Sequence, residues 1–228
     1  MINIGTTDFY LGVPSLPVDE FESYSTKLFE EWEEYVGDIL KLPDYCLVLD
    51  VQEGSISAKS KILVGATAIC GFLATYGSIS SGAKNLYTDI TAAGNYLGIR
   101  ASAPFPDANV KPKIRNRGEA LSKLQSLFVR VAKGTLSPEE AMILARNIFG
   151  DDVPEFMDQL KDSLEKTPSQ LSLPIEEPEE QSIILPKDND REPPSRKPKV
   201  HVIRPEQYRV EIWRESKKSE RNIRVRKV

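Results

Sequence analysis

The sequence has little of the residues that usually carry metal and redox chemistry. Its 228 residues include only two cysteines, Cys46 and Cys70, and a single histidine, His201. Two cysteines cannot form a disulfide framework, and one histidine excludes zinc fingers and metal sites built from several histidines. The sequence therefore predicts no metal site, and its cysteine content fits a reducing compartment.

A complete phosphate-binding loop is also missing. Residues 54–60 read GSISAKS, but Ala58 stands where the loop needs its second glycine, and the spacing is one residue short. The many acids are paired with no histidine, cysteine or glycine-rich loop in a pattern that assigns catalytic roles. We therefore expect no catalytic residues and no cofactor, and an enzyme is the third choice among the functional hypotheses.

Charge, although close to balanced overall at −4, is unevenly distributed along the chain. Residues 1–57 hold two lysines against twelve acids, whereas residues 111–133 hold seven basic residues against Glu119 alone. Residues 191–228 hold thirteen basic residues against five glutamates. Such separation favours contact of the basic segments with an anionic partner, either phosphates, lipid headgroups or the acidic part of a neighbouring chain, although an ordinary solvated surface has the same composition. The candidate anion-binding residues are Lys111, Lys113, Arg115, Arg117, Arg204, Arg209 and Arg214.

The acidic first segment, residues 1–60, predicts a strand, a helix and a β-hairpin. Residues 2–10 are strand-like, and apolar residues recur at steps of three and four from Phe21 to Ile39, which is typical of an amphipathic helix. Residues 45–52 alternate between apolar and other residues, and a turn at residues 53–54 leads into a second short strand over residues 55–59.

Residues 62–80 form an uncharged run, ILVGATAICGFLATYGSIS. A helix of this length would span roughly 28 Å, close to the hydrocarbon thickness of a bilayer. The run predicts a transmembrane helix within a region of residues 61–98, whose later part continues as a weaker amphipathic helix. A buried central helix of a folded domain is the alternative interpretation.

Small residues in this run are regularly spaced. Ala66, Cys70, Ala74, Ser78 and Gly82 follow one another at steps of four, which would place them on one face of a single helix. Small side chains let membrane helices approach closely, and hydroxyl groups can line a wet pore. The predicted helix-packing or pore-lining residues are Gly65, Ala66, Thr67, Cys70, Gly71, Ala74, Thr75, Ser78 and Gly82.

The rest of the chain predicts a small helical bundle, a linker and a β-prone tail. Residues 99–166 hold three amphipathic segments. The second begins at Ser137-Pro138-Glu139-Glu140, which is a strong helix start, and Asp152 is the predicted cap of the third. Residues 167–199 are rich in proline and charge and indicate a disordered linker, whereas residues 200–228 alternate basic and apolar residues. The expected fold class is α+β, mainly α.

Residues 53–82, EGSISAKSKILVGATAICGFLATYGSISSG, resemble the hairpin-plus-helix region of small bacterial antiphage transmembrane effectors, such as the channel effector of the Hailong system. The resemblance implies a homo-oligomeric channel in the bacterial inner membrane, gated by a nucleic-acid-like signal, with its water-exposed parts in the cytoplasm.

Two functional hypotheses follow. In the first, the protein is a membrane-inserting, homo-oligomeric channel or pore of bacterial defence whose partners are itself, the lipid membrane and a nucleotide signal or single-stranded nucleic acid. In the second, it is a soluble adaptor that keeps the uncharged helix in its core and binds nucleic acid or a protein through its basic tail. Interleaved aromatic and arginine residues of that tail, including Tyr208 and Trp213, suit single-stranded nucleic acid but also suit an ordinary amphipathic strand.

Overall fold

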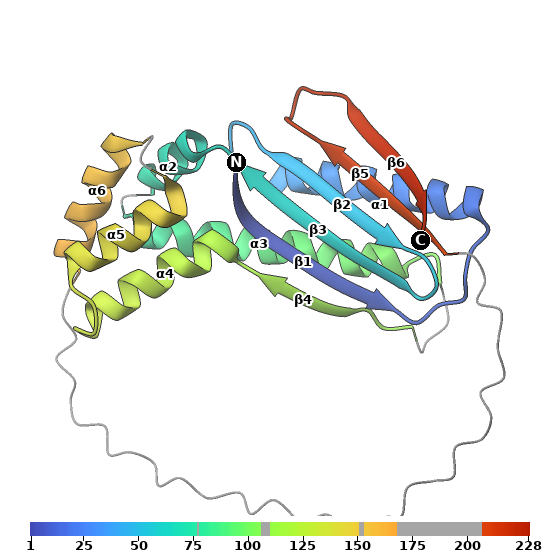
Figure 1. Cartoon of the computed structure of the whole chain (residues 1–228), viewed down its shortest axis with the longest axis horizontal. Helices are drawn as coiled ribbons and strands as arrows, with labels where there is room; N and C mark the ends of the chain where they lie inside the picture. The colour runs from blue at the N-terminus through green and yellow to red at the C-terminus, as the bar shows by residue number, and fades with distance from the viewer. Residues whose placement is uncertain (77, 106–109, 151–152, 168–206) are drawn as a thin grey trace, which may run out of the picture.

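The structure, a computed structural model, describes residues 1–76, 78–105, 110–150, 153–167 and 207–228 (Figure 1). These residues form an α+β fold with six helices and a six-stranded antiparallel sheet, which confirms the expected class. The predicted linker, residues 167–199, lies outside the described residues except for Thr167, as do residues 200–206 of the predicted tail.

The sheet is assembled from both ends of the chain. Its strands run in the order β4-β1-β3-β2-β5-β6, so β4 and β6 are the edge strands. Every neighbouring pair is antiparallel. The strand bounds are β1 Ile2–Leu11, β2 Cys46–Gln52, β3 Ile56–Val64, β4 Lys113–Arg117, β5 Tyr208–Arg214 and β6 Arg221–Lys227.

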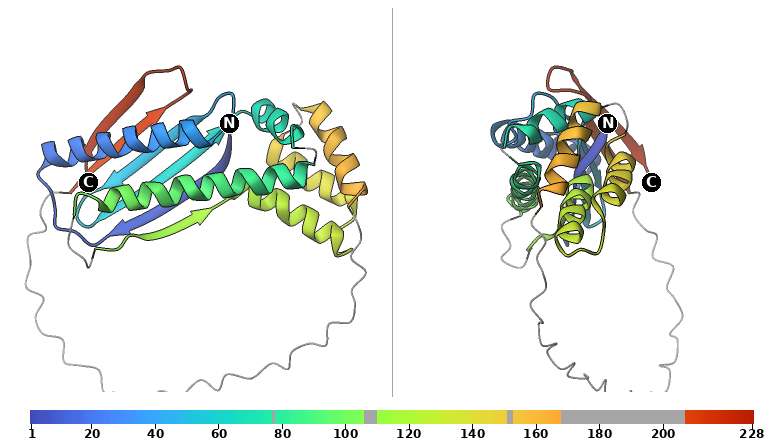
Figure 2. Two further views of the ribbon diagram at one scale, coloured as in Figure 1. Left: turned by 180° about the vertical axis from the view of Figure 1, so that it is seen from behind. Right: turned by 90° about the vertical axis from the view of Figure 1, so that its left-hand side faces the viewer.

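Two long helices, α1 (Val18–Ile39) and α3 (Ile79–Ser102), cover one face of this sheet (Figure 2). The apolar stripe predicted from Phe21 onward faces the core, where Phe21, Leu28 and Trp32 are almost completely buried. Polar contacts join the two helices, since Arg100 pairs with Glu31 at 2.6 Å and the hydroxyl of Tyr24 donates to the carbonyl of Ala101 at 2.8 Å.

Four shorter helices form a cluster with the N-terminal part of α3 beyond one end of the sheet (Figure 1). They are α2 Ala66–Ala74, α4 Glu119–Ala132, α5 Pro138–Phe149 and α6 Pro154–Glu165. The predicted helix start is confirmed, because Ser137 and Glu140 form a reciprocal capping box at the beginning of α5. Asp152, the predicted cap of the next helix, lies outside the described residues, and Val153 occupies the position before α6.

The prediction of one transmembrane helix over residues 62–80 is wrong. Ile62 and Val64 complete β3, the chain then forms the short helix α2, and a new helix begins at Ile79 after Ser78 accepts a hydrogen bond from the backbone N–H of Ser81. Among the described residues, no helix combines the length and the apolar character needed to cross a bilayer. The run lacks charge because its strand and helix portions both contribute to the protein core, where Ile62, Ile69 and Leu73 are buried.

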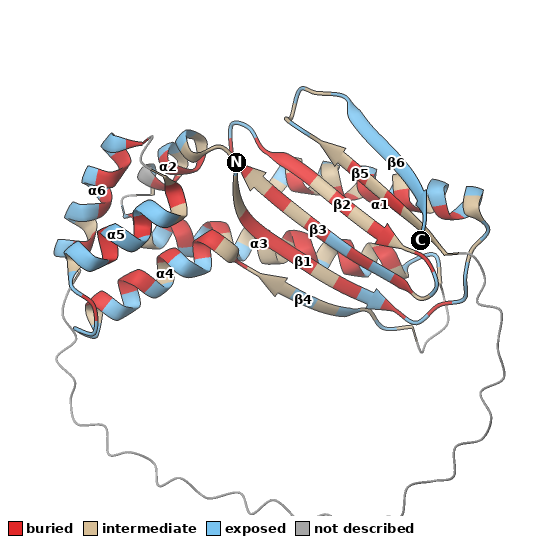
Figure 3. Cartoon of the chain, in the orientation of Figure 1, coloured by how far each residue is buried: buried red, intermediate tan, exposed pale blue. Residues whose placement is uncertain are grey.

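Burial follows the layers of the fold (Figure 3). The core extends without interruption from the space between the sheet and the two long helices into the helical cluster. The exposed strand β6 lies at the opposite end, and all seven of its residues are exposed. Because an exposed edge strand can pair with other chains, its four basic residues, Arg221, Arg224, Arg226 and Lys227, help to keep this edge from aggregating.

Candidate functional site

One face of the sheet is covered by α1 and α3, and no described element covers the opposite face (Figures 1 and 2). Strand alternation decides which side chains reach each face. Thr7 of β1 and Asn116 of β4 point towards the helices, where the Thr7 hydroxyl donates to the Asn116 side-chain oxygen at 2.8 Å. Their sequence neighbours therefore point to the uncovered face.

Strand register gathers basic residues from four strands, β3, β4, β5 and β6, on this uncovered face. In one row across the sheet, Arg115, Asp8, Lys59, Asp50, Glu211 and Arg224 are successive partners. The flanking rows run from Lys113 through Tyr10 to Arg226 and from Arg117 through Lys61 to Asn222. We call this surface the basic sheet face; its charged residues are the cations Lys59, Lys61, Lys113, Arg115, Arg117, Arg209, Arg224 and Arg226 and the acids Asp8, Asp50 and Glu211.

Arginines already neutralise the three acids of the basic sheet face. Arg117 pairs with Asp8 at 2.5 Å, and Arg209 forms two hydrogen bonds with Asp50. Arg226 lies 3.4 Å from Glu211, which also pairs with Arg209 at 3.7 Å. The hydrogen bonds that Arg209 donates to Asp50 raise the pKa of Arg209 above its usual value, so this side chain stays charged.

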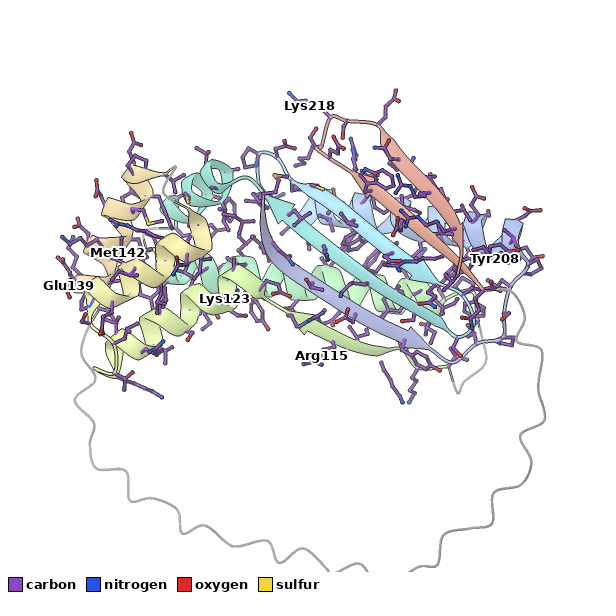
Figure 4. All side chains as sticks on the ribbon, in the orientation of Figure 1. Arg115, Lys123, Glu139, Met142, Tyr208 and Lys218 are labelled. Atoms are coloured by element: carbon purple, nitrogen blue, oxygen red, sulfur yellow. The ribbon has the colours of Figure 1, made fainter. Side chains whose placement is uncertain are left out.

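Five cations of the face have no ion pair within the described ranges: Lys59, Lys61, Lys113, Arg115 and Arg224. All but the half-buried Lys61 are exposed. Figure 4 shows Arg115 on the edge strand β4, far from the turn that carries Lys218. These side chains are consequently available to an external anion.

A pocket of about 450 Å³ lies within the basic sheet face. Residues of β2, β3, β5 and β6 line it: Val48, Asp50, Lys59, Lys61, Arg209, Glu211, Trp213 and Arg224. The guanidinium of Arg224 is 5.6 Å from the centre of the Trp213 ring, within the range of a cation–π interaction. The pocket thus combines an aromatic ring with several positive charges.

The predicted anion-binding residues separate into three groups. Lys113, Arg115, Arg117 and Arg209 belong to the basic sheet face, and Lys111 is exposed just before β4. Arg214 points to the helix-covered side instead, where it pairs with Glu33 of α1 and donates to the carbonyl of Ser219. Arg204 lies outside the described residues.

Sequence reasoning missed Lys59, Lys61, Arg224 and Arg226 as members of one surface. The alternation of residues 57–61 was a usable signal, since Ser57, Lys59 and Lys61 occupy every second position. Only the pairing of β3 with β2, and of β2 with β5, brings these lysines beside the basic tail.

The predicted helix-packing or pore-lining residues do not lie along one helix. Gly65 precedes α2; Ala66, Thr67, Cys70, Gly71 and Ala74 lie within it; Thr75 follows it, Ser78 caps α3, and Gly82 lies in α3. Thr67, Cys70 and Gly71 border a second pocket of about 350 Å³ next to residues of α6. At Gly82, an added Cβ would lie 3.1 Å from the carbonyl oxygen of Leu73, so this glycine lets α2 and α3 of the same chain approach closely.

Both cysteines are buried, and burial raises the pKa of the Cys70 thiol to about 12 and also raises the pKa of Cys46. Neither thiol therefore has the low pKa of a reactive cysteine. No cluster of three or more metal-ligating side chains occurs among the residues that the structure describes.

Comparison of the chain with protein-family models, with curated proteins and with solved structures found no match. The basic sheet face is therefore interpreted from its own chemistry. Flexible cations beside exposed aromatic rings can neutralise phosphates and stack on unpaired bases, which are the two interactions that most single-strand-binding surfaces combine.

Proposed function

We propose that the protein is an adaptor that binds single-stranded nucleic acid on its basic sheet face. One observation carries the proposal: Lys59, Lys61, Lys113 and Arg115 have no ion-pair partner among the described residues and share an uncovered face with the rings of Tyr10 and Trp213. Phosphate neutralisation by such cations provides affinity without regard to sequence.

The dimensions of the face suit a short single strand. Six strands spaced by about 4.8 Å give a width of roughly 24 Å, which is about seven nucleotides at a stacked rise of about 3.4 Å. Proteins that bind single strands through a sheet stack bases on exposed aromatic rings, whereas the bases of a duplex are already paired and stacked. Tyr10, which is 44% exposed, and the partly exposed Trp213 favour the single strand over the duplex.

A lipid surface fits the face less well. Surfaces that lie on membranes insert large apolar side chains between the headgroups, next to the cations. Among the exposed large apolar residues of the described ranges, Ile99, Val129, Ile143 and Leu144 belong to helices, and Ile223 and Val225 of β6 alternate with the residues that point to this face.

The transmembrane-channel hypothesis is not part of this proposal. It depended on one continuous helix over residues 62–80, and the structure divides that run between β3, α2 and the start of α3. The adaptor hypothesis keeps its support, because the basic tail joins the sheet through β5 and places Arg209 and Trp213 on the uncovered face.

Binding of a fluorescently labelled oligothymidylate of fifteen nucleotides, measured by anisotropy over a salt series, tests the proposal. We expect affinity to fall steeply with salt, with a logarithmic slope of about −0.7 for each phosphate that the protein neutralises. The double substitution Lys59→Ala and Lys61→Ala should weaken binding and make this slope shallower by about 1.4 if each lysine contacts one phosphate.

Lys123→Ala is the matched control, because Lys123 is exposed on α4 and belongs to none of the rows of the basic sheet face (Figure 4). It should leave both the affinity and the salt slope unchanged. Absence of binding by the unmodified chain, or equal effects of the control and the double substitution, would contradict the proposal.

A further inference from the structure

We infer that the pocket around Trp213 is a nucleotide site in which one base stacks on the Trp213 ring beneath Arg224, while Lys59 and Lys61 hold the adjacent phosphate. This inference rests on the proposed function and gives it a defined position on the sheet. The ligand class is a nucleotide within a single strand, recognised through the faces of its base and its phosphate.

The pocket has the size and composition of a small-ligand site. Its volume of about 450 Å³ falls in the usual range of about 300–1,000 Å³. Register places Trp213 opposite Val48 and Val48 opposite Lys61, so the ring and the lysine lie on the same face two strands apart. Two strand spacings amount to about 10 Å, a distance that the base, sugar and phosphate of one nucleotide together bridge.

A base can stack on Trp213 only if it enters between the ring and the guanidinium of Arg224. The guanidinium lies 5.6 Å from the centre of the ring, whereas a base between two planar groups needs about 3.4 Å on each side, or about 6.8 Å in all. The guanidinium must therefore move outward by about 1 Å, and β6 permits this because it is an exposed edge strand. A guanidinium stacks on a base as readily as on an indole, so Arg224 then covers the outer face of the base.

The acids of the pocket determine where the phosphate lies. Asp50 and Glu211 are held by Arg209 and Arg226 and leave little positive charge on the β5 side. Lys59 and Lys61 of β3 and Arg224 of β6 form no ion pair within the described residues. Because Arg224 lies over the Trp213 ring, where the base stacks, the positive charge open to the phosphate is on the β3 side. Repulsion from the carboxylates and attraction by the lysines both direct the phosphate towards β3.

Tryptophan fluorescence reports on this site directly. The chain has two tryptophans, and Trp32 is 1% exposed in the core, whereas Trp213 is partly exposed in the pocket. Titration with oligothymidylate should quench the emission of Trp213. An oligomer of the same length built from abasic residues carries the phosphates without the bases, and we expect it to bind more weakly and to cause no quenching.

Trp213→Ala should weaken oligothymidylate binding by about 5- to 150-fold, the range found for loss of one stacked base, and should leave binding of the abasic oligomer unchanged. Trp213→Phe keeps an aromatic ring and should retain most of the affinity. Comparison of the two variants separates the loss of the stacking ring from misfolding caused by the alanine substitution. Lys113→Ala, a control outside the pocket, should weaken both oligomers equally.

The two proposals fail in different ways. The nucleotide site is wrong if Trp213→Ala binds oligothymidylate as tightly as the unmodified chain while the double substitution Lys59→Ala and Lys61→Ala weakens binding. It is also wrong if oligothymidylate binds without quenching the tryptophan emission. In both cases the proposal that the basic sheet face binds phosphates stands. If the unmodified chain binds neither oligomer, both proposals are wrong.

Discussion

At the scale of single residues, a close contact between α3 and the sheet depends on Gly94. A Cβ at this position would lie 2.2 Å from both the Thr7 hydroxyl and the Asn116 side-chain oxygen. These two groups are hydrogen-bonded to each other, and Asn116 also donates to Asn95 at 2.8 Å. The glycine thus allows a polar contact that fixes the edge strand β4 to the helix and orients the alternate residues Arg115 and Arg117 towards the basic sheet face.

We predict that Gly94→Ala lowers the free energy of unfolding by about 1–3 kcal/mol, the usual cost of overpacking a well-packed site. Urea unfolding followed by circular dichroism measures the change. Gly71→Ala is the control, because no described atom lies within 4 Å of its added Cβ, and alanine favours a helix by up to about 1 kcal/mol over glycine. Equal destabilisation by the two substitutions would contradict the close contact at Gly94.

Burial of Cys70 gives stability a dependence on alkaline pH. The pKa of its thiol is about 12 in the folded chain, against an ordinary value of 9.0. A raised folded-state pKa contributes stability that is complete below the unfolded pKa and is lost as pH rises from about 9 to about 12. Burial raises the pKa of Tyr24 as well, so its hydroxyl acts in the same direction.

We therefore predict that the free energy of unfolding is level near pH 8 and falls as pH rises above about 9, by up to about 1.4 kcal/mol per pH unit for each proton that only the unfolded chain releases. Denaturant unfolding at a series of pH values measures this. In the native state at pH 8, a thiol reagent such as dithionitrobenzoate should react with Cys70 only at the rate of unfolding. Rapid reaction of both thiols without denaturant would show that the buried environment is wrong.

At the scale of elements, the hairpin β5–β6 is an integral part of the sheet. Val210 and Ile212 of β5 are completely buried between the sheet and α1. Arg214 pairs with Glu33, and Arg221 lies 2.7 Å from Glu30 and 4.0 Å from Glu33, so three ion pairs also attach the hairpin to α1. From the sequence, these residues are predicted to be a tail that follows a proline-rich linker. That prediction underestimates their contribution to stability.

Removal of residues 207–228 should lower stability by several kcal/mol, since each fully buried valine or isoleucine contributes about 1.5–3 kcal/mol and β2 would become an unprotected edge. Thermal unfolding by circular dichroism should show a melting temperature lower by more than about 10 °C, or no cooperative transition. The double substitution Arg224→Ala and Arg226→Ala removes charge but keeps the strand, and should change the melting temperature by only a few degrees because exposed ion pairs contribute little. Equal melting temperatures for the truncated and full-length chains would contradict this role of the hairpin.

At the scale of the whole molecule, the uneven charge of the sequence becomes two oppositely charged layers. The exposed acids of α1, among them Glu20, Glu22, Glu34 and Asp38, lie on the helix layer, and the cations of the basic sheet face lie on the other side of the sheet. Such separation of charge orients the protein as a polyanion approaches, with the basic sheet face towards the polyanion and the helices away from it. It also speeds association of the two at low salt. It is also the reason why the net charge of −4 is a poor guide to what the uncovered face can bind.

The local structure of many elements could be predicted because it depends on near neighbours in the sequence. The strand over residues 2–10, the helix that includes Phe21 to Ile39, the strand over residues 45–52 and the start of α5 are all confirmed. The basic sheet face could be predicted only in part, since Lys113, Arg115, Arg117 and Arg209 were expected to bind anions. Their grouping with Lys59 and Lys61 depends on a strand order that joins residues more than a hundred positions apart.

By itself, the sequence determined the periodicity of its helices and strands, the low content of cysteine and histidine, and the separation of acidic and basic segments. Only the tertiary structure decided the fate of residues 62–80, because a run without charge is equally suited to lipid and to a protein core, and its regular step of four continues across two different helices. The tertiary structure also decided which cations remain free, because Arg214 pairs with Glu33 of α1 while Lys59 and Lys61 form no ion pair within the described residues. Pairing of charges depends on distances in space, which the order of residues along the chain does not contain.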